Sequence, residues 1–445
     1  MTETWEQRRM PERVKFEDML SSLRRSLEAV PEHRTGSNTR YDMVDVGLGA
    51  FSVFCLQSPS FLVYQQQMRK QHGRDNAKSL FGIENIPSDG QTRNLLDPVA
   101  PSFLREPFWD IYHLVQASGY LERYRHVAGT LLVSMDGTRY FSSEKVHCDQ
   151  CTVYEYEDST SCVHMVLAAV LSAPGQPHVL ALEPEFIVPQ DGYDKQDCEQ
   201  QAIKRWLARN AKRFEDWSVT TLTDDLHSHQ PLCELLLEHK FHFILTCKPE
   251  SHQTLYQEIE LLTRVEGAHQ THTIRRWIGH HYEQWRYHWV NALPLRTGKD
   301  PLRVNWCEVT VVRESTGEQL YHNAWITSHE LTPETVEHVA DAGRARWKVE
   351  NEGFNVLKNQ GYAFEHNFGH GHQHLSTVLL TMLFLAFLFH SVLHLTWPLY
   401  QAIRRALGAR RNFFNDLRAL TRYFYFQYWD AMIAFMAKEL EVEPI

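Results

Sequence analysis

Three acidic residues are placed where they could hold metal ions. Asp136 ends an apolar run, Asp224 ends a β-branched run, and Glu350 lies on the apolar stripe of a predicted amphipathic helix. Carboxylate oxygens are the ligands that hard cations such as Mg²⁺ prefer. Three carboxylates on rigid elements can hold two divalent ions about 3.5–4 Å apart, which is the arrangement for in-line displacement at phosphorus.

Each acid also has a purely structural interpretation. Arg346 precedes Glu350 by one helical turn, so the two could form an ion pair on a half-buried helix. Asp136, which is followed by glycine, could be a turn residue, and Asp224 could cap a helix. Both sets of alternatives remain open at this level.

The elements that would position the acids follow an α/β order. Apolar segments predict strands over 130–135, 152–156 and 163–171, which we interpret as an antiparallel meander. Helices and strands then alternate, with helices expected over 195–213 and 231–239 and strands over 219–223 and 241–246. In this order Asp136 and Asp224 each end a strand.

The long stretch between Asp224 and Glu350 is predicted to be rich in β-strands. Alternating patterns run over 283–295, 303–313 and 320–327. Alternation in the first places three aromatic residues on one face of its strand: Trp285, Tyr287 and Trp289. They are either the core of a small sheet or, less favoured, a surface on which a base stacks.

Both ends of the chain are predicted to be helical. The apolar run 378–389 is shorter than the about 20 residues that a membrane span needs, so we expect a buried core helix. A basic run follows, with Arg404, Arg405, Arg410 and Arg411. These arginines either contact phosphates or form a solvated helix face.

Composition excludes some classes of function. The net charge of −10 over 445 residues argues against a protein that coats nucleic acid over its whole surface, although a local basic groove is compatible with it. Eight cysteines without regular disulfide spacing, and an N-terminus without an apolar leader, predict a cytoplasmic protein that does not cross a membrane.

Three motifs resemble those of DDE transposases from bacterial insertion sequences, in the IS-four-like group with an RNase H-like catalytic core. They are Asp136-Gly-Thr, Thr223-Asp-Asp-Leu and Arg344-Ala-Arg-Trp-Lys-Val-Glu350. The resemblance covers about residues 130 to 400. It implies that Asp136, Asp224 and Glu350 bind two Mg²⁺ or Mn²⁺ ions and catalyse DNA cleavage and strand transfer.

The resemblance also implies partners and an organisation. Double-stranded DNA, both element ends and target, would contact Arg344, Arg346, Trp347 and Lys358, and two copies of the chain would act as a homodimer. The expected parts are a helical region 1–128 that could bind DNA ends, a first core part 129–248, a β-rich insertion 249–332, a second core part 333–400 and a helical region 401–445. The alternatives are a structure-selective nuclease on the same core, or a domesticated protein that binds DNA without cutting it.

The chain departs from the family pattern at two positions. Gly343 stands where the family has tyrosine, and Lys358 lies one residue beyond the place of the motif lysine, where Leu357 stands. One residue turns a helical side chain by about 100°. Two neighbouring acids, Asp225 and Glu352, compete with the assigned ones, but Asp225 lies beyond the strand end and Glu352 lies off the apolar stripe.

A cysteine and histidine cluster offers a second kind of metal chemistry. Cys148, Cys151, Cys162 and His164 could bind a structural Zn²⁺, although the sequence favours reduced core cysteines. The later stretch with His370, His372 and His374 is interpreted as a loop without fixed geometry, because glycines separate the histidines.

Overall fold

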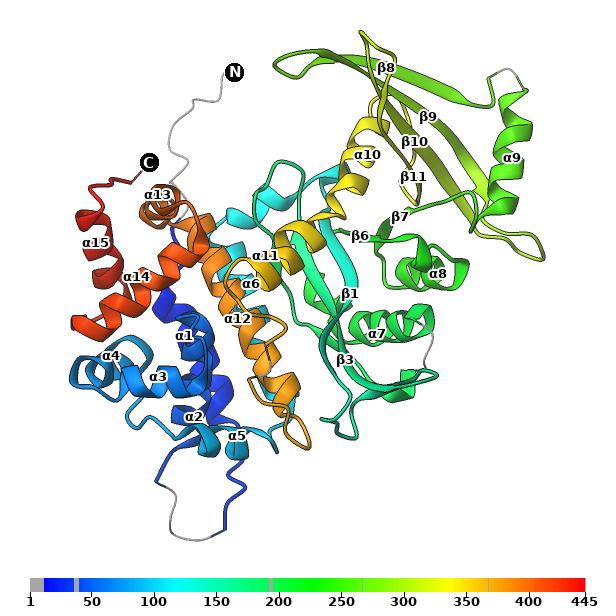
Figure 1. The fold of residues 1–445 in the computed structure, drawn as a ribbon. Helices are drawn as coiled ribbons and strands as arrows, with labels where there is room; N and C mark the ends of the chain where they lie inside the picture. Colours follow the sequence, from blue (N-terminus) through cyan, green and yellow to red (C-terminus); the bar gives the residue numbers. More distant parts are fainter. Residues whose placement is uncertain (1–11, 36–39, 192–194, 266, 367, 445) are drawn as a thin grey trace.

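The computed structural model describes residues 12–35, 40–191, 195–265, 267–366 and 368–444. Within this part of the chain the fold is α/β, with one mixed sheet of eleven strands and flanking helices (Figure 1). The expected class, a mixed sheet with flanking helices, is therefore confirmed at this level.

The first half of the sheet is built around two long neighbouring strands. β1 (Leu131–Ser143) pairs antiparallel with β3 (Thr160–Ser172). The other edge of β3 pairs with β2 (Thr152–Glu155), β4 (Leu180–Ala181) and β5 (Glu185–Ile187). The expected meander is therefore wrong in its order, because β3 and not β2 lies next to β1. The short β2 pairs only with the first residues of β3, and the longer β3 takes the place next to β1.

Two parallel strands continue the sheet on the other side of β1. β6 (Val219–Thr223) runs parallel to β1, and β7 (His242–Thr246) runs parallel to β6. The helices α7 (Lys195–Asn210) and α8 (Gln230–Glu238) make the crossovers. Parallel neighbours need such crossovers, whereas antiparallel ones do not.

Alternation along these strands divides the core into two faces. Leu132 and Leu222 belong to the cluster that includes α10 (Val336–Ala345), whereas Leu131 and Val133 belong to the larger cluster with residues of α7 and α8. Successive side chains of a strand point to opposite faces. The even positions of β1 and β6 therefore face α10.

The stretch between the two core parts contains the expected strands and two elements that we did not expect. β9 (Tyr282–Pro294), β10 (Arg303–Arg313) and β11 (Gln319–Thr327) were expected, whereas α9 (Gln253–Thr263) and β8 (Gln270–Trp277) were not. β11 pairs antiparallel with β7, so these strands extend the same sheet. The three aromatic residues of β9 are buried, with Tyr287 fully inside, so they are core residues and offer no stacking surface.

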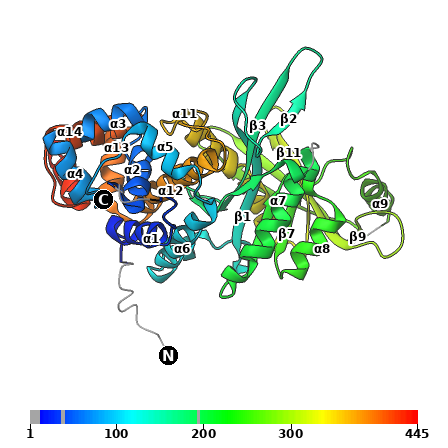
Figure 2. The same cartoon turned by 90° about the horizontal axis from the view of Figure 1, so that it is seen from below.

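Helices from both ends of the chain pack together beside the sheet (Figure 2). They are α1 (Phe16–Glu28), α2 (Met43–Cys55), α3 (Phe61–Met68), α4 (Gln71–Phe81), α5 (Asp89–Leu96), α6 (Glu106–Ala117), α13 (Pro398–Leu407), α14 (Arg410–Tyr423) and α15 (Trp429–Glu439). α12 (Leu375–Thr396) lies between the N-terminal helices and the strands (Figure 1).

α12 is the one helix in the described residues that is long and apolar enough to cross a membrane. However, 94% of its most apolar window is buried inside the protein, which is the pattern of a core helix in a soluble protein. The expected buried core helix is confirmed.

Close packing accounts for the glycine at position 343. Gly343 on α10 lies under the indole of Trp325 on β11, and a Cβ at this position would be 2.5 Å from the indole nitrogen. Trp325 is fully buried and cannot move aside. A side chain at position 343 is therefore incompatible with this helix-on-sheet contact.

We predict that Gly343→Ala lowers the free energy of unfolding by about 1–3 kcal/mol, because the added methyl overpacks the contact with Trp325. Gly353→Ala is the matched control, since its Cβ would meet its nearest neighbour at 3.8 Å. The control should change stability by less than about 1 kcal/mol. Equal losses in the two variants, measured by urea unfolding, would contradict this account of position 343.

Candidate active site

Asp136 lies on β1, and Asp224 directly follows β6, the parallel neighbour of β1, where its side chain caps a short 3-10 helix by accepting from the backbone N–H of Leu226. The pairing runs from Leu131 opposite Val219 to Ser134 opposite Leu222. Continuing this register by two residues brings Asp136 level with Asp224. Neighbouring strands are about 4.8 Å apart, and both positions are on the face that α10 covers. Asp136 does not end its strand as expected, because β1 continues to Ser143 through its pairing with β3.

Glu350 approaches the same region from the helix that follows α10. The helix continues through a π-helical segment, Val349–Phe354, into α11 (Asn355–Asn359), and the π-helical segment packs against β1 and β3. The expected apolar stripe holds at Phe354 but not at Trp347, whose side chain is 45% exposed. A turn at residues 346–347 and the wider π-helical turn rotate the face of the helix between these positions.

The π-helical segment also accounts for the displaced lysine. A π-helical turn closes i→i+5 hydrogen bonds and so takes up one more residue than an α-helical turn. Lys358 can therefore reach the direction that a lysine one residue earlier would have in a regular α-helix. Its Nζ donates to Oγ1 of Thr138 at 3.1 Å, two residues from Asp136.

The electrostatics of Asp136 reflect its burial and the charges around it. Burial is the largest of the influences that together raise its pKa to about 7. The negative charges of Glu350 and Asp224 both contribute to this rise. The guanidinium of Arg346 opposes it. Asp136 is thus within electrostatic reach of both other expected acids.

The structural ion pair is present as well. Nη1 of Arg346 donates to Oε1 of Glu350 at 2.9 Å, and Arg346 is 5% exposed. Because the same guanidinium acts on Asp136, this pair belongs to the acidic group and is not isolated on its helix. The guanidinium also lies 4.1 Å from the ring of Trp347, which fixes its orientation.

A fourth carboxylate, which the sequence analysis missed, lies on the opposite side of β1. Glu199 of α7 is 2% exposed, and its Oε1 lies 2.3 Å from the place of a Cβ on Gly137. Its charge also raises the pKa of Asp136. Nε2 of His227 bridges the two acids, 2.9 Å from Glu199 and 3.6 Å from Asp224. A signal existed, because Glu199 shares a helical stripe with the buried Ala202 and Ile203.

The two competing acids have other partners. Asp225 accepts hydrogen bonds from the backbone N–H of Lys248 and from the hydroxyl of Ser251, so it holds the segment after β7. Glu352 pairs with Lys348 at 3.2 Å. Asp224 and Glu350 are among the groups whose charges act on Asp136, whereas Asp225 and Glu352 are not among those named influences.

Arg344 is placed differently from the other residues expected to contact DNA. Its guanidinium lies 4.8 Å from the ring of Trp285 and 4.9 Å from that of Tyr321. It therefore joins α10 to β9 and β11 through cation–π contacts.

A basic cavity of about 810 Å³ lies beside the C-terminal end of α11, the last part of the helix that carries Glu350. Its lining includes Asn359 and Gln360 after α11, together with five arginines and two histidines: Arg123, Arg404, Arg405, Arg410, Arg411, His178 and His394. Arg404 is 7% exposed, and within the described residues its buried Nη1 has no hydrogen-bond partner. Burial and the charges of Arg410, Arg404 and Lys348 lower the pKa of His178 to about 4. This cavity concentrates positive charge that the protein leaves uncompensated.

Comparisons with known proteins do not assign this site. No family model matches the chain, and no curated protein matches it.

The cysteine and histidine cluster differs from the expected set by one member. Cys148, Cys151 and His164 come together as expected, but His370 completes the group in place of Cys162. Within the described residues, the three acids do not form a metal-binding group of comparable tightness.

The pKa of Asp136 predicts how stability depends on pH. The folded protein holds this proton up to about pH 7, whereas the unfolded chain releases it near 3.8. Without divalent ions, the free energy of unfolding should therefore fall as the pH rises through this window. Asp136→Asn removes the effect, so its stability relative to wild type should be higher at pH 8 than at pH 4, by on the order of 1–3 kcal/mol.

The measurement is urea unfolding of both proteins at the two pH values in buffer without Mg²⁺ or Mn²⁺. Glu215→Gln removes an exposed acid and should give the same difference from wild type at both pH values. A pH-independent difference for Asp136→Asn would show that Asp136 lies outside the acidic group.

Proposed function

We propose that this protein is a DDE transposase that cuts and joins DNA by divalent-metal-dependent phosphoryl transfer. The proposal rests on one group of acids: the charges of Asp224, directly after β6, and of Glu350, on the helix after α10, both raise the pKa of Asp136 on β1. Asp136 is the centre of this group, since the charges of both other acids act on it. A buried carboxylate whose pKa is raised by acids from two other segments is typical of a functional site.

The strand order supports an RNase H-like core. Antiparallel strands come first, with β1 bearing Asp136, and two parallel strands and a helix bearing Glu350 follow. This agrees with the order of elements expected from the resemblance, apart from the position of β2.

The residues present fit a pair of divalent cations in the chemistry of their donors. Asp136, Asp224 and Glu350 would supply the oxygen ligands for Mg²⁺ or Mn²⁺. The bound ions would lower the pKa of the attacking water or 3′-hydroxyl and stabilise the leaving oxygen. Arg346, which holds Glu350 in the metal-free protein, would then be released towards a phosphate oxygen. Lys358 is placed beside Thr138 to contact the same backbone.

The basic cavity at the C-terminal end of α11 would bind the DNA backbone. Phosphate contacts supply affinity without sequence information, and the unpartnered guanidinium of Arg404 is suited to them. The partners would be double-stranded DNA, as element ends and target, and a second copy of the chain. The protein would act in the cytoplasm.

Glu350→Gln separates catalysis from the structural ion pair. The variant keeps the shape of the side chain but removes the charge that holds a cation, so Mn²⁺-dependent nicking of supercoiled plasmid should fall at least about 100-fold. Its thermal midpoint and DNA affinity should stay close to those of wild type. Glu352→Gln is the control and should keep its nicking activity. A Glu350→Gln protein that is destabilised but nicks normally per folded molecule would disprove the mechanism.

Strand transfer distinguishes the transposase from a nuclease. The substrate is duplex DNA carrying the sequences that flank the gene, with a plasmid as target. Joined products that depend on Glu350 support the transposase, whereas cutting without joining under the same conditions would reassign the protein as a nuclease.

The basic cavity predicts a salt dependence. Arg405→Gln/Arg411→Gln should weaken DNA binding and reduce the slope of log K against log salt by about 2, because two phosphate contacts are lost. Arg25→Gln/Arg264→Gln removes the same charge from other exposed sites and should leave the slope unchanged. Equal slopes for the two double variants in fluorescence anisotropy titrations would show that the cavity does not contact DNA.

A further inference from the structure

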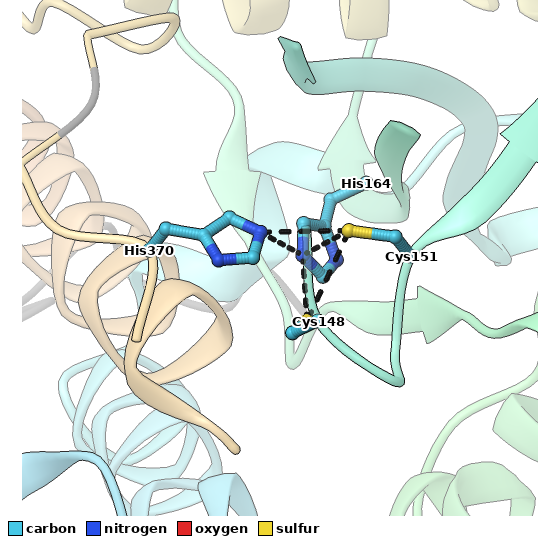
Figure 3. Close-up of side chains that lie close together, drawn as sticks. All are labelled: Cys148, Cys151, His164 and His370. Atoms are coloured by element: carbon cyan, nitrogen blue, oxygen red, sulfur yellow. Dashed lines mark hydrogen bonds between the residues drawn. The ribbon is translucent and has the colours of Figure 1, made fainter. Parts of the chain in front are cut away.

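Four side chains from three separate segments point their ligand atoms at one another (Figure 3). Cys148 and Cys151 lie between β1 and β2, His164 lies on β3, and His370 lies in the loop between α11 and α12. All four ligand atoms lie within 4.8 Å of one another. None of these residues takes part in the acidic site.

The distances match the edges of a tetrahedron around a zinc ion. With Zn–S of about 2.3 Å and Zn–N of about 2.0–2.1 Å, the edges should be about 3.8 Å between sulfurs, about 3.3 Å between nitrogens and about 3.6 Å between sulfur and nitrogen. The two sulfurs are 3.9 Å apart, and Nε2 of His164 is 3.1 Å from Nε2 of His370. The sulfur–nitrogen distances that involve Cys151 are both 3.4 Å, and Cys148 lies 3.5 Å from His164.

We propose that Cys148, Cys151, His164 and His370 bind one structural Zn²⁺, which joins the β1–β3 end of the sheet to the loop that follows the Glu350 helix. The site is of the Cys₂His₂ class and is closed: Cys151, His164 and His370 are all less than 10% exposed. A closed tetrahedral site leaves no coordination position for a substrate, so the role is structural.

The surroundings prepare the ligands for a metal. Nδ1 of His370 donates to the carbonyl of Gly371 at 2.9 Å, which leaves Nε2 free to accept a cation. The backbone N–H of Cys151 donates to the carbonyl of Cys148 at 3.1 Å, a tight turn that aims both sulfurs to one side. The ring of Tyr140 stacks on His164 with its centre 5.6 Å away, which fixes the ring plane.

The loop that carries His370 is held from the helical side as well. One carboxylate, that of Asp97 after α5, accepts hydrogen bonds from the backbone N–H groups of His372, Gln373 and Leu375. Arg93 of α5 donates to the carbonyl of Phe368 at 2.9 Å. His370 therefore has fixed geometry, in contrast to the expectation for a glycine-rich loop. The zinc would close a connection from the helical region through this loop to the sheet.

The zinc site is separate from the acidic site. His164 is opposite Phe141 in the β1–β3 pairing, whereas Asp136 is opposite Ala168. Five residues along a strand span about 17 Å. The inference does not depend on the proposed function, and a failure of one leaves the other standing.

The test is the metal content and the cobalt spectrum of the full-length protein, purified without a histidine tag. Plasma mass spectrometry should find one zinc per chain. Replacing the zinc with Co²⁺ should give the intense visible bands of a tetrahedral site together with thiolate-to-metal charge transfer. Cys162→Ser is the matched control and should keep one zinc per chain, since Cys162 lies outside the tetrahedron.

Ligand variants test the assignment further. Cys151→Ser should lose the zinc and the charge-transfer band. His370→Cys should keep the metal and strengthen the band, because a third thiolate replaces a nitrogen, and it provides a folded variant if Cys151→Ser does not fold. Wild-type protein without zinc after incubation with Zn²⁺, zinc retained in Cys151→Ser, or stoichiometric iron in place of zinc would each overturn the proposal.

Discussion

The repulsion between carboxylates gathered around one β-strand is the constraint on which the rest of the site depends. Asp136 and Glu199 occupy opposite sides of β1, and Asp224 and Glu350 approach the first of them. Burial and neighbouring charges raise the pKa of Asp136 to about 7, Arg346 pairs with Glu350, and the imidazole of His227 lies between Glu199 and Asp224.

This arrangement explains why the helix that carries Glu350 is irregular. Its first part must lie flat on the sheet, which the missing side chain of Gly343 allows. Its second part must present Glu350 and Lys358 to β1, and the π-helical segment supplies the rotation between the two. The glycine at position 343 and the placement of Lys358 therefore both follow from how this helix packs on the sheet.

The sequence predicted most strands of the sheet but not how they pair. Period and alternation identified β1, β6, β7 and β9 to β11, because each buries a face whose residues repeat, whereas β8 and α9 were missed. The order of β2 and β3 was wrong because pairing partners depend on strand lengths that the pattern does not contain. The apolar stripe predicted a buried Trp347 because it assumes a regular α-helix. No residue pattern predicts a π-helical turn.

The members of the two sites were predictable to different degrees. The motif residues stood out by type and spacing, whereas Glu199 was found only because the structure places it against Gly137. His370 takes the place of Cys162 in the cysteine and histidine cluster for a similar reason: His370 lies in a loop more than 200 residues from Cys151 in the chain. Sequence proximity favoured Cys162, and only the fold reveals the nearer ligand.

The central claim is that Asp136, Asp224 and Glu350 form one site for divalent cations. The most direct measurement is a crystal structure of the protein with Mn²⁺, in which anomalous scattering locates the metal without reference to any activity. The account predicts anomalous peaks bounded by the carboxylates of these three residues, with Arg346 moved away from Glu350. An acidic site without Mn²⁺ at saturating concentration, with the Arg346–Glu350 pair intact, would contradict it.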